Sequence, residues 1–100
     1  MPSNPGERGL LILTSLVSGA KHGYALMQDI ESFAGVRLGP GTLYGALTRL
    51  EEDGLVTALP ADDRRRPYAI TPAGSALLEQ ELSQNAKIAK IGLKRLAAAS

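Results

Sequence analysis

The hydrophobic positions along the chain change from helical spacing to short strand-like runs and back again. Apolar residues lie three or four positions apart in 22–34 and 40–53, which places them on one face of a helix. A denser apolar block in 7–18 predicts a helix that is apolar nearly all round and must be covered on more than one side. The stretches 55–59 and 68–70 are short and apolar or alternating, and they predict two β-strands.

Glycine, proline and threonine mark where these elements begin and end. Gly54 follows the third helical segment and predicts its C-terminal end. Pro40 and Pro72 suit the first turn of a helix, and Thr71 suits the N-cap of the last one. The polar segment between the two strands predicts a hairpin with a charged tip. The order of elements predicts a mainly α fold with a small β-hairpin wing, a winged helix-turn-helix.

The last predicted helix, residues 72–98, carries two apolar stripes. One stripe can pack on the body of the domain, whereas the other needs a partner. We expect that a monomer of 100 residues cannot cover both this helix and the first one, and that the protein is a dimer. Within a single structural domain, residues 1–71 are expected to form the winged helix-turn-helix and residues 72–100 a dimerisation helix.

Composition narrows the classes of function. The chain is 44% hydrophobic and 21% charged, which is typical of a globular protein. It has no cysteine and one histidine, so a disulfide framework, a cysteine-ligated metal and a thiol nucleophile are excluded. No catalytic set of side chains is present, and we expect neither enzyme activity nor a cofactor or metal. The polar first residues and the lack of a long apolar run predict a cytoplasmic protein outside the membrane.

Several separated motifs resemble the PadR family of transcriptional regulators. They are His22-Gly23-Tyr24, Gly41-Thr42-Leu43-Tyr44, Leu47, Leu50-Glu51, Asp53-Gly54-Leu55-Val56, Arg66, Tyr68-Ala69-Ile70-Thr71 and Gly74. The resemblance covers roughly residues 9–80 and includes the spacing between the motifs. It implies a winged helix-turn-helix whose C-terminal helix forms a homodimer, and an activity that is usually repression, relieved in some members by a small ligand. The single C-terminal helix looks like the shorter-tailed branch of the family.

The chain also departs from the family. Gly45 stands where a larger side chain is expected, which adds flexibility and removes one base contact. Family members that bind flat drugs between subunits use a tryptophan, and this chain has none. That mode of ligand binding is therefore not expected here.

The third predicted helix is the first candidate surface for DNA. A recognition helix places its N-terminal residues at base edges in the major groove. An alternative interpretation is that Tyr44 is a half-buried core ring and that Arg49 pairs with Asp53 one turn later. The candidate DNA contacts on this helix are Thr42, Tyr44, Gly45, Thr48 and Arg49.

Basic residues elsewhere provide candidate contacts to the DNA backbone. Arg64, Arg65 and Arg66 lie at the hairpin tip, where guanidinium groups suit phosphates or a minor groove. The alternative is a solvated tip that nearby aspartates partly neutralise. Lys21 precedes the second helix and is a weaker candidate for a phosphate contact. His22, the single histidine, is predicted to cap the second helix.

Together these features predict a sequence-specific, DNA-binding transcriptional regulator, a repressor that acts as a homodimer on a pseudo-palindromic operator. Its expected partners are double-stranded DNA, a second copy of the chain and a small-molecule effector. Two other interpretations stay open: a winged-helix module for protein interaction, and a small-molecule sensor without DNA binding. The residues expected at the dimer contact or effector pocket are Leu10, Leu11, Leu13, Ile88, Ile91, Leu93 and Leu96.

Overall fold

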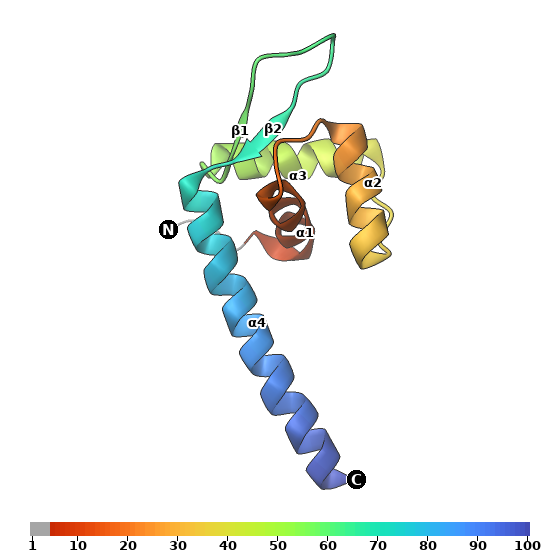
Figure 1. The fold of residues 1–100 in the computed structure, drawn as a ribbon, viewed down its shortest axis with the longest axis vertical. Coiled ribbons are helices and arrows are strands. Elements are labelled where there is room, and N and C mark those ends of the chain that lie inside the picture. Colours follow the sequence, from red (N-terminus) through yellow and green to blue (C-terminus); the bar gives the residue numbers. More distant parts are fainter. Residues whose placement is uncertain (1–4) are drawn as a thin grey trace.

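The computed structural model describes residues 5–100, and its elements confirm the predicted winged-helix architecture (Figure 1). Each helix and strand begins and ends within one residue of the bounds predicted from the sequence. Residues 1–4, which belong to the expected first unit, lie outside the described residues. The elements in chain order are α1 (Gly6–Val17), α2 (Gly23–Ala34), α3 (Pro40–Glu52), β1 (Val56–Ala58), β2 (Tyr68–Ile70) and α4 (Pro72–Ala99).

The first helix, α1, lies at the centre of the body and packs against α2, α3, α4 and β2. Its residues Ile12, Leu13 and Leu16 are almost completely buried. The chain itself therefore covers most of the dense apolar pattern of α1, as expected for a helix that needs cover on several sides. Among the exposed large hydrophobic residues of residues 5–100, α1 contributes only Val17, which is 59% exposed, while Leu10 and Leu11 are partly buried.

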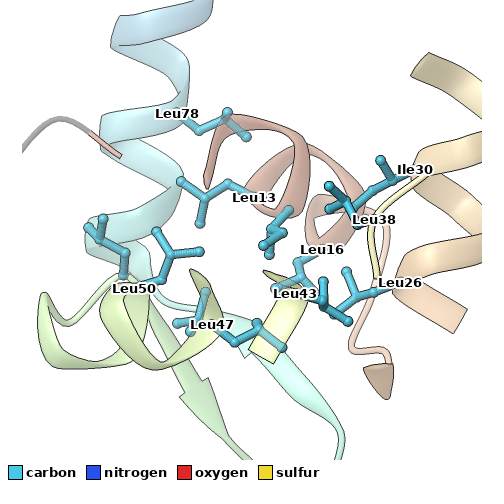
Figure 2. Packing of buried hydrophobic residues seen from close by; sticks show 12 residues of the cluster. Leu13, Leu16, Leu26, Ile30, Leu38, Leu43, Leu47, Leu50 and Leu78 are labelled. Atoms are coloured by element: carbon cyan, nitrogen blue, oxygen red, sulfur yellow. The ribbon is translucent and has the colours of Figure 1, made fainter. Parts of the chain in front are cut away.

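The core joins the helices through leucine and isoleucine side chains (Figure 2). Leu43, Leu47 and Leu50 of α3 belong to it, and Figure 2 shows Leu43 next to Leu16 of α1 and Leu26 of α2. Burying a side chain of this size stabilises the fold by about 1.5–3 kcal/mol. Because its three leucines are held in this way, α3 turns its opposite face towards solvent.

The hairpin is a two-stranded antiparallel sheet in which Val56 pairs with Ile70 and Ala58 with Tyr68. Tyr68 also pairs with Lys21 in the connection between α1 and α2, through backbone N–H to carbonyl bonds of 3.0 and 2.9 Å. The base of the wing is thus attached to the start of α2. At the tip, Asp63 and Arg64 have φ angles of 51° and 70°, as the central residues of a type I′ turn require.

The last helix begins at a well-defined joint. Thr71 caps α4 as predicted, because its hydroxyl oxygen accepts the N–H of Gly74 at 3.0 Å. Gly74 lies against the backbone carbonyl of Leu55, and a Cβ at this position would also come within 2.9 Å of the Ile70 side chain. Leu78 is the next buried residue, at 4% exposure.

Beyond this joint, α4 leaves the body and projects away from it (Figure 1). The prediction that one apolar stripe of α4 can pack on the domain holds as far as Leu78 and is wrong from Leu82 onward. Both stripes are exposed there, because no other element of residues 5–100 reaches them. The exposed apolar residues are Leu82, Ile88, Ile91, Leu93 and Leu96.

Candidate nucleic-acid interface

The face of α3 that points away from the core has two positions without a side chain. Gly41 and Gly45 lie there, and a Cβ built on either residue would have no neighbouring atom within 4 Å. Thr48 lies one turn after Tyr44, and its hydroxyl donates to the Tyr44 carbonyl at 2.9 Å. The backbone of α3 can therefore come close to an outside surface, as a helix in a major groove must.

Tyr44 lies on the flank of α3 that faces the start of α2. The residue is 45% exposed, and its ring packs over Gly23 so closely that a Cβ there would lie 2.7 Å from Tyr44 Cζ. The ring is thus supported by the protein on one side and open to solvent on the other. This arrangement combines features of the two interpretations that the sequence left open, a core ring and a DNA contact.

Tyr68, at the base of the wing, lies in the same region. Burial raises the pKa of Tyr68, and the negative charge of Glu51 and the nearby Tyr44 raise it further, while Arg66 lowers it. The Tyr68 hydroxyl is therefore protonated at neutral pH and available as a donor. Glu51, Arg66 and the two tyrosines are close enough in space for their charges to interact.

The opposite flank of α3 faces the N-terminal turn of α1. Thr42 and Arg49 line a hollow of about 570 Å³ there together with Arg8, while Glu7 and Asp53 contribute negative charge. Arg8 was not among the residues predicted from the sequence. One signal was present, since a basic residue in the first turn of a helix opposes the helix dipole and needs another reason to be there.

The wing arginines differ in their surroundings. All three are exposed, but Arg65 turns back to the start of α2, where its Nη1 lies 3.2 Å from Nε2 of His22. His22 also caps α2 as predicted, with Nδ1 accepting the N–H of Ala25 at 3.4 Å. The link between His22 and the wing could not be seen in the sequence, because the two residues are 43 positions apart.

Lys21 is occupied within the chain. Its ammonium group donates to the carbonyl of Ser15, to Ser18 Oγ at 2.8 Å and to the carbonyl of Gly19 at 3.4 Å. It therefore satisfies carbonyl groups at the C-terminal end of α1, where a cation is favourable. A phosphate contact by Lys21 would have to compete with these bonds.

The residues expected at a dimer or effector site are not brought together by one chain. Leu13 is fully buried in the core, and Leu10 and Leu11 pack partly against it. Leu11 also lines a hollow of about 320 Å³ to which no residue of α4 contributes. The four others lie on the exposed half of α4: Ile88, Ile91, Leu93 and Leu96.

Other kinds of site find little support in residues 5–100. No helix in this range is both long and apolar enough to cross a membrane. No group of acidic or histidine side chains in the same range has the arrangement of a metal site.

Comparison with known proteins identifies relatives for this architecture. The transcriptional regulator PadR-like family matches residues 12–80. A transcriptional regulator from Mycobacterium tuberculosis is 44% identical over 75 residues, which are 72% of this chain and 69% of the relative. An uncharacterised 37.1 kDa protein in a Streptomyces fradiae transposon is 49% identical over 79 residues, and the match spans only 23% of that protein. The crystal structure of a PadR family regulator from Clostridium difficile has a TM-score of 0.82 at 25% identity, covering 91% of this chain and 99% of that one.

Proposed function

Since this chain belongs to the PadR-like family of transcriptional regulators, we propose that it is a homodimeric repressor which binds a pseudo-palindromic DNA operator. The observation that carries the proposal is the exposed face of α3, which the core leucines hold outward and which the wing extends on one side. The family match runs from α1 into the first turns of α4 and therefore includes all of these elements. Residues 1–71 would bind DNA and residues 72–100 would hold the dimer together.

In the proposed complex, α3 enters the major groove. Gly41 and Gly45 allow its backbone to approach the base edges, and Thr42 and Thr48 supply hydroxyl groups there. Tyr44 gives its hydroxyl to a phosphate on the flank next to the wing. Arg49 suits a phosphate on the other flank, and Arg8 beside it widens that basic surface.

The wing supplies the second part of the proposed contact. Arg64 and Arg66 are exposed and suit phosphates or a narrow minor groove. The aspartates at the tip reduce the local positive charge, so the affinity gained from each arginine is expected to be modest.

The second copy of the chain would pack against the free half of α4. Leu93 is 68% exposed and Leu96 is 67% exposed, although water is a poor environment for leucine. An isolated amphipathic helix of this length is also only marginally stable in water. A two-fold dimer would present two α3 helices to half-sites that lie about one turn of DNA apart, roughly 34 Å.

We extend the proposal to a small-molecule effector, which would bind between α1 of one copy and α4 of the other. One chain alone does not form such a site, so the effector would act on a pocket that dimerisation completes. The protein would work in the cytoplasm, as a regulator and not as a catalyst.

One observation favours a second candidate, a winged helix that binds protein and not DNA. Arg65 makes a contact inside the chain, as expected for such a module. Filter binding with generic duplex DNA at low salt separates the two candidates, because an interaction module would retain no duplex.

The decisive experiment for the proposed function is selection of bound duplexes from a random library by the full chain. We expect enrichment of a motif with two related halves and a salt-dependent affinity for it. Enrichment of a single half-site would contradict the dimer on DNA. A lack of any binding at low salt would contradict the proposed function.

A further inference from the structure

The wing contacts the body at its base and at its tip. Its base is held by the backbone bonds between Tyr68 and Lys21. Its tip is held by Arg65, whose Nη1 lies 3.2 Å from Nε2 of His22 at the start of α2. We infer that His22 is a positioning residue for DNA binding, which fixes the wing tip through Arg65 before DNA arrives. Arg65 then serves this latch and is not a phosphate ligand, an inference that rests on the proposed function.

The chemistry of the two groups defines the direction of the bond. A guanidinium group can only donate, so the latch requires the tautomer of His22 in which Nε2 is the acceptor. A neutral imidazole has one acceptor nitrogen, and Nδ1 faces the N–H of Ala25 at 3.4 Å. The ring can therefore serve the latch or the helix cap, but not both at the same moment, and the contact with Arg65 is the shorter of the two.

The surroundings of the latch leave Arg65 as the cation that faces His22. The latch residues and the wing tip line an open hollow of about 440 Å³, and Asp62 and Asp63 are among its lining residues. The ammonium group of Lys21 also borders this region, but its donors are used at the end of α1. Arg65 and His22 therefore line this hollow together with two acidic residues, Asp62 and Asp63.

The geometry of the turn gives the latch a structural purpose. Asp63 and Arg64 both have positive φ angles, which are unfavourable for residues other than glycine and normally persist only where surrounding contacts hold them. Two backbone bonds between Asp62 and Arg65, of 2.6 and 2.8 Å, close the turn. The Arg65 side chain adds a contact outside the hairpin directly after the strained residues.

The latch also connects the wing to the recognition helix. Tyr44 of α3 packs on Gly23, the residue that follows His22. The start of α2 is therefore a common support for the wing tip and for the flank of α3. A wing held in place before binding loses less conformational freedom in the complex than a mobile one, and this raises affinity without a direct contact.

Four variants of the full chain test this inference in the absence of DNA: His22→Asn, Arg65→Ala, the double variant and Arg64→Ala. Asparagine is a strong N-cap, so His22→Asn removes the latch and keeps the cap.

The readout is amide hydrogen exchange at Leu59, Asp62 and Arg65, whose N–H groups bond across the wing. Loss of the latch should speed this exchange roughly two- to fivefold, the size of one exposed hydrogen bond, in both single variants and no further in the double variant. Arg64→Ala is the matched control and should leave the exchange unchanged.

The same variants are then titrated with the duplex selected from the random library at several salt concentrations. His22→Asn and Arg65→Ala should each weaken binding roughly two- to fivefold with an unchanged salt slope, and the double variant should be no weaker. Arg64→Ala should lower the slope by roughly 1, the loss of one phosphate contact. The inference is overturned if Arg65→Ala lowers the slope as Arg64→Ala does, or if the two single effects add. Should the parent protein bind no duplex, the proposed function fails, while the exchange experiment still decides whether the latch exists.

Discussion

The Tyr44 ring can pack on Gly23 because Gly23 has no side chain. We predict that Gly23→Ala displaces the Tyr44 ring, because the added methyl group would overlap its hydroxyl end. The end of a side chain can move, so the free energy of unfolding should fall by only about 1 kcal/mol. Affinity for the selected duplex should fall more than stability does. Urea unfolding and DNA titration measure the two quantities, and an unchanged affinity would show that the position of Tyr44 does not matter for binding.

Gly45→Ala is the matched control for that variant, because it adds the same methyl group to a helix position with open space around it. We predict a gain in the free energy of unfolding of about 0.5–1 kcal/mol, since alanine is the better helix former. The same urea experiment checks this value. A loss of stability would mean that the α3 backbone at this position is not regular helix.

Tyr44→Phe separates the ring from its hydroxyl group. The ring still packs on Gly23, so the free energy of unfolding should stay within about 0.5 kcal/mol of the parent. If the hydroxyl bonds a phosphate, the binding free energy should weaken by about 1 kcal/mol. Equal affinity of the variant and the parent for the selected duplex would remove this hydroxyl from the interface.

At this scale, helical spacing was enough to predict which side chains of α3 point inward. The leucines lie in the core as expected, and His22 caps α2 as expected. The partners of Lys21 and Arg65 were not predictable, because one finds the carbonyl groups of a helix end and the other finds an imidazole 43 residues away. A charged residue in a sequence shows its charge but not the internal acceptors that compete with DNA for it.

At the scale of elements, the wing carries two exposed arginines, Arg64 and Arg66, that are proposed to contact phosphates. We predict that Arg64→Ala and Arg66→Ala each lower the salt slope of DNA binding by roughly 1, because each removes one phosphate contact. The loss should be similar on the selected and on a scrambled duplex, since phosphates carry no sequence. Fluorescence titration at several salt concentrations gives the slopes, and parallel lines for parent and variants would contradict a role of these arginines.

The two halves of α4 should respond differently to the loss of a leucine. Leu78 is buried against the body, so Leu78→Ala should lower the free energy of unfolding by about 2–4 kcal/mol. Leu93 is 68% exposed and lies outside the core cluster, so we expect the main effect of Leu93→Ala on association. Unfolding measured at several protein concentrations distinguishes the two, because only an effect on association changes with concentration.

The apolar stripes of α4 were predictable from the sequence. Which part of each stripe the body covers was not predictable. Periodicity shows which residues share a face, but it does not show where a helix leaves the body that it starts on. Here the joint at Gly74 and Leu78 directs α4 outward, and the residues after it lie beyond the reach of the other elements. Most of the exposed large hydrophobic residues of residues 5–100 therefore lie on α4, and α1 contributes only Val17.

At the scale of the whole molecule, the folded body and the proposed dimer contact lie in separate regions of the chain. We predict that Leu93→Glu yields a monomer whose body stays folded, because no core residue touches that position. The distal part of α4 should lose helicity once it has no partner, since a single exposed helix is marginal in water. Analytical ultracentrifugation at micromolar concentration and circular dichroism provide the two readouts. A parent protein that sediments as a folded monomer would refute the dimer.

Because α4 is one unbroken helix from Pro72 to Ala99, its length and phase would set the spacing of the operator in the proposed dimer. One residue inserted between Leu82 and Ile88 would rotate each winged helix-turn-helix by about 100° relative to the proposed dimer contact on α4. The recognition helix would then no longer face its half-site. Seven inserted residues, about two turns, would restore the facing and move each winged helix-turn-helix roughly 10 Å along the axis, which is about three base pairs of DNA. Chains with α4 helices of different lengths should thus select operators with different spacers, even where their recognition helices are identical.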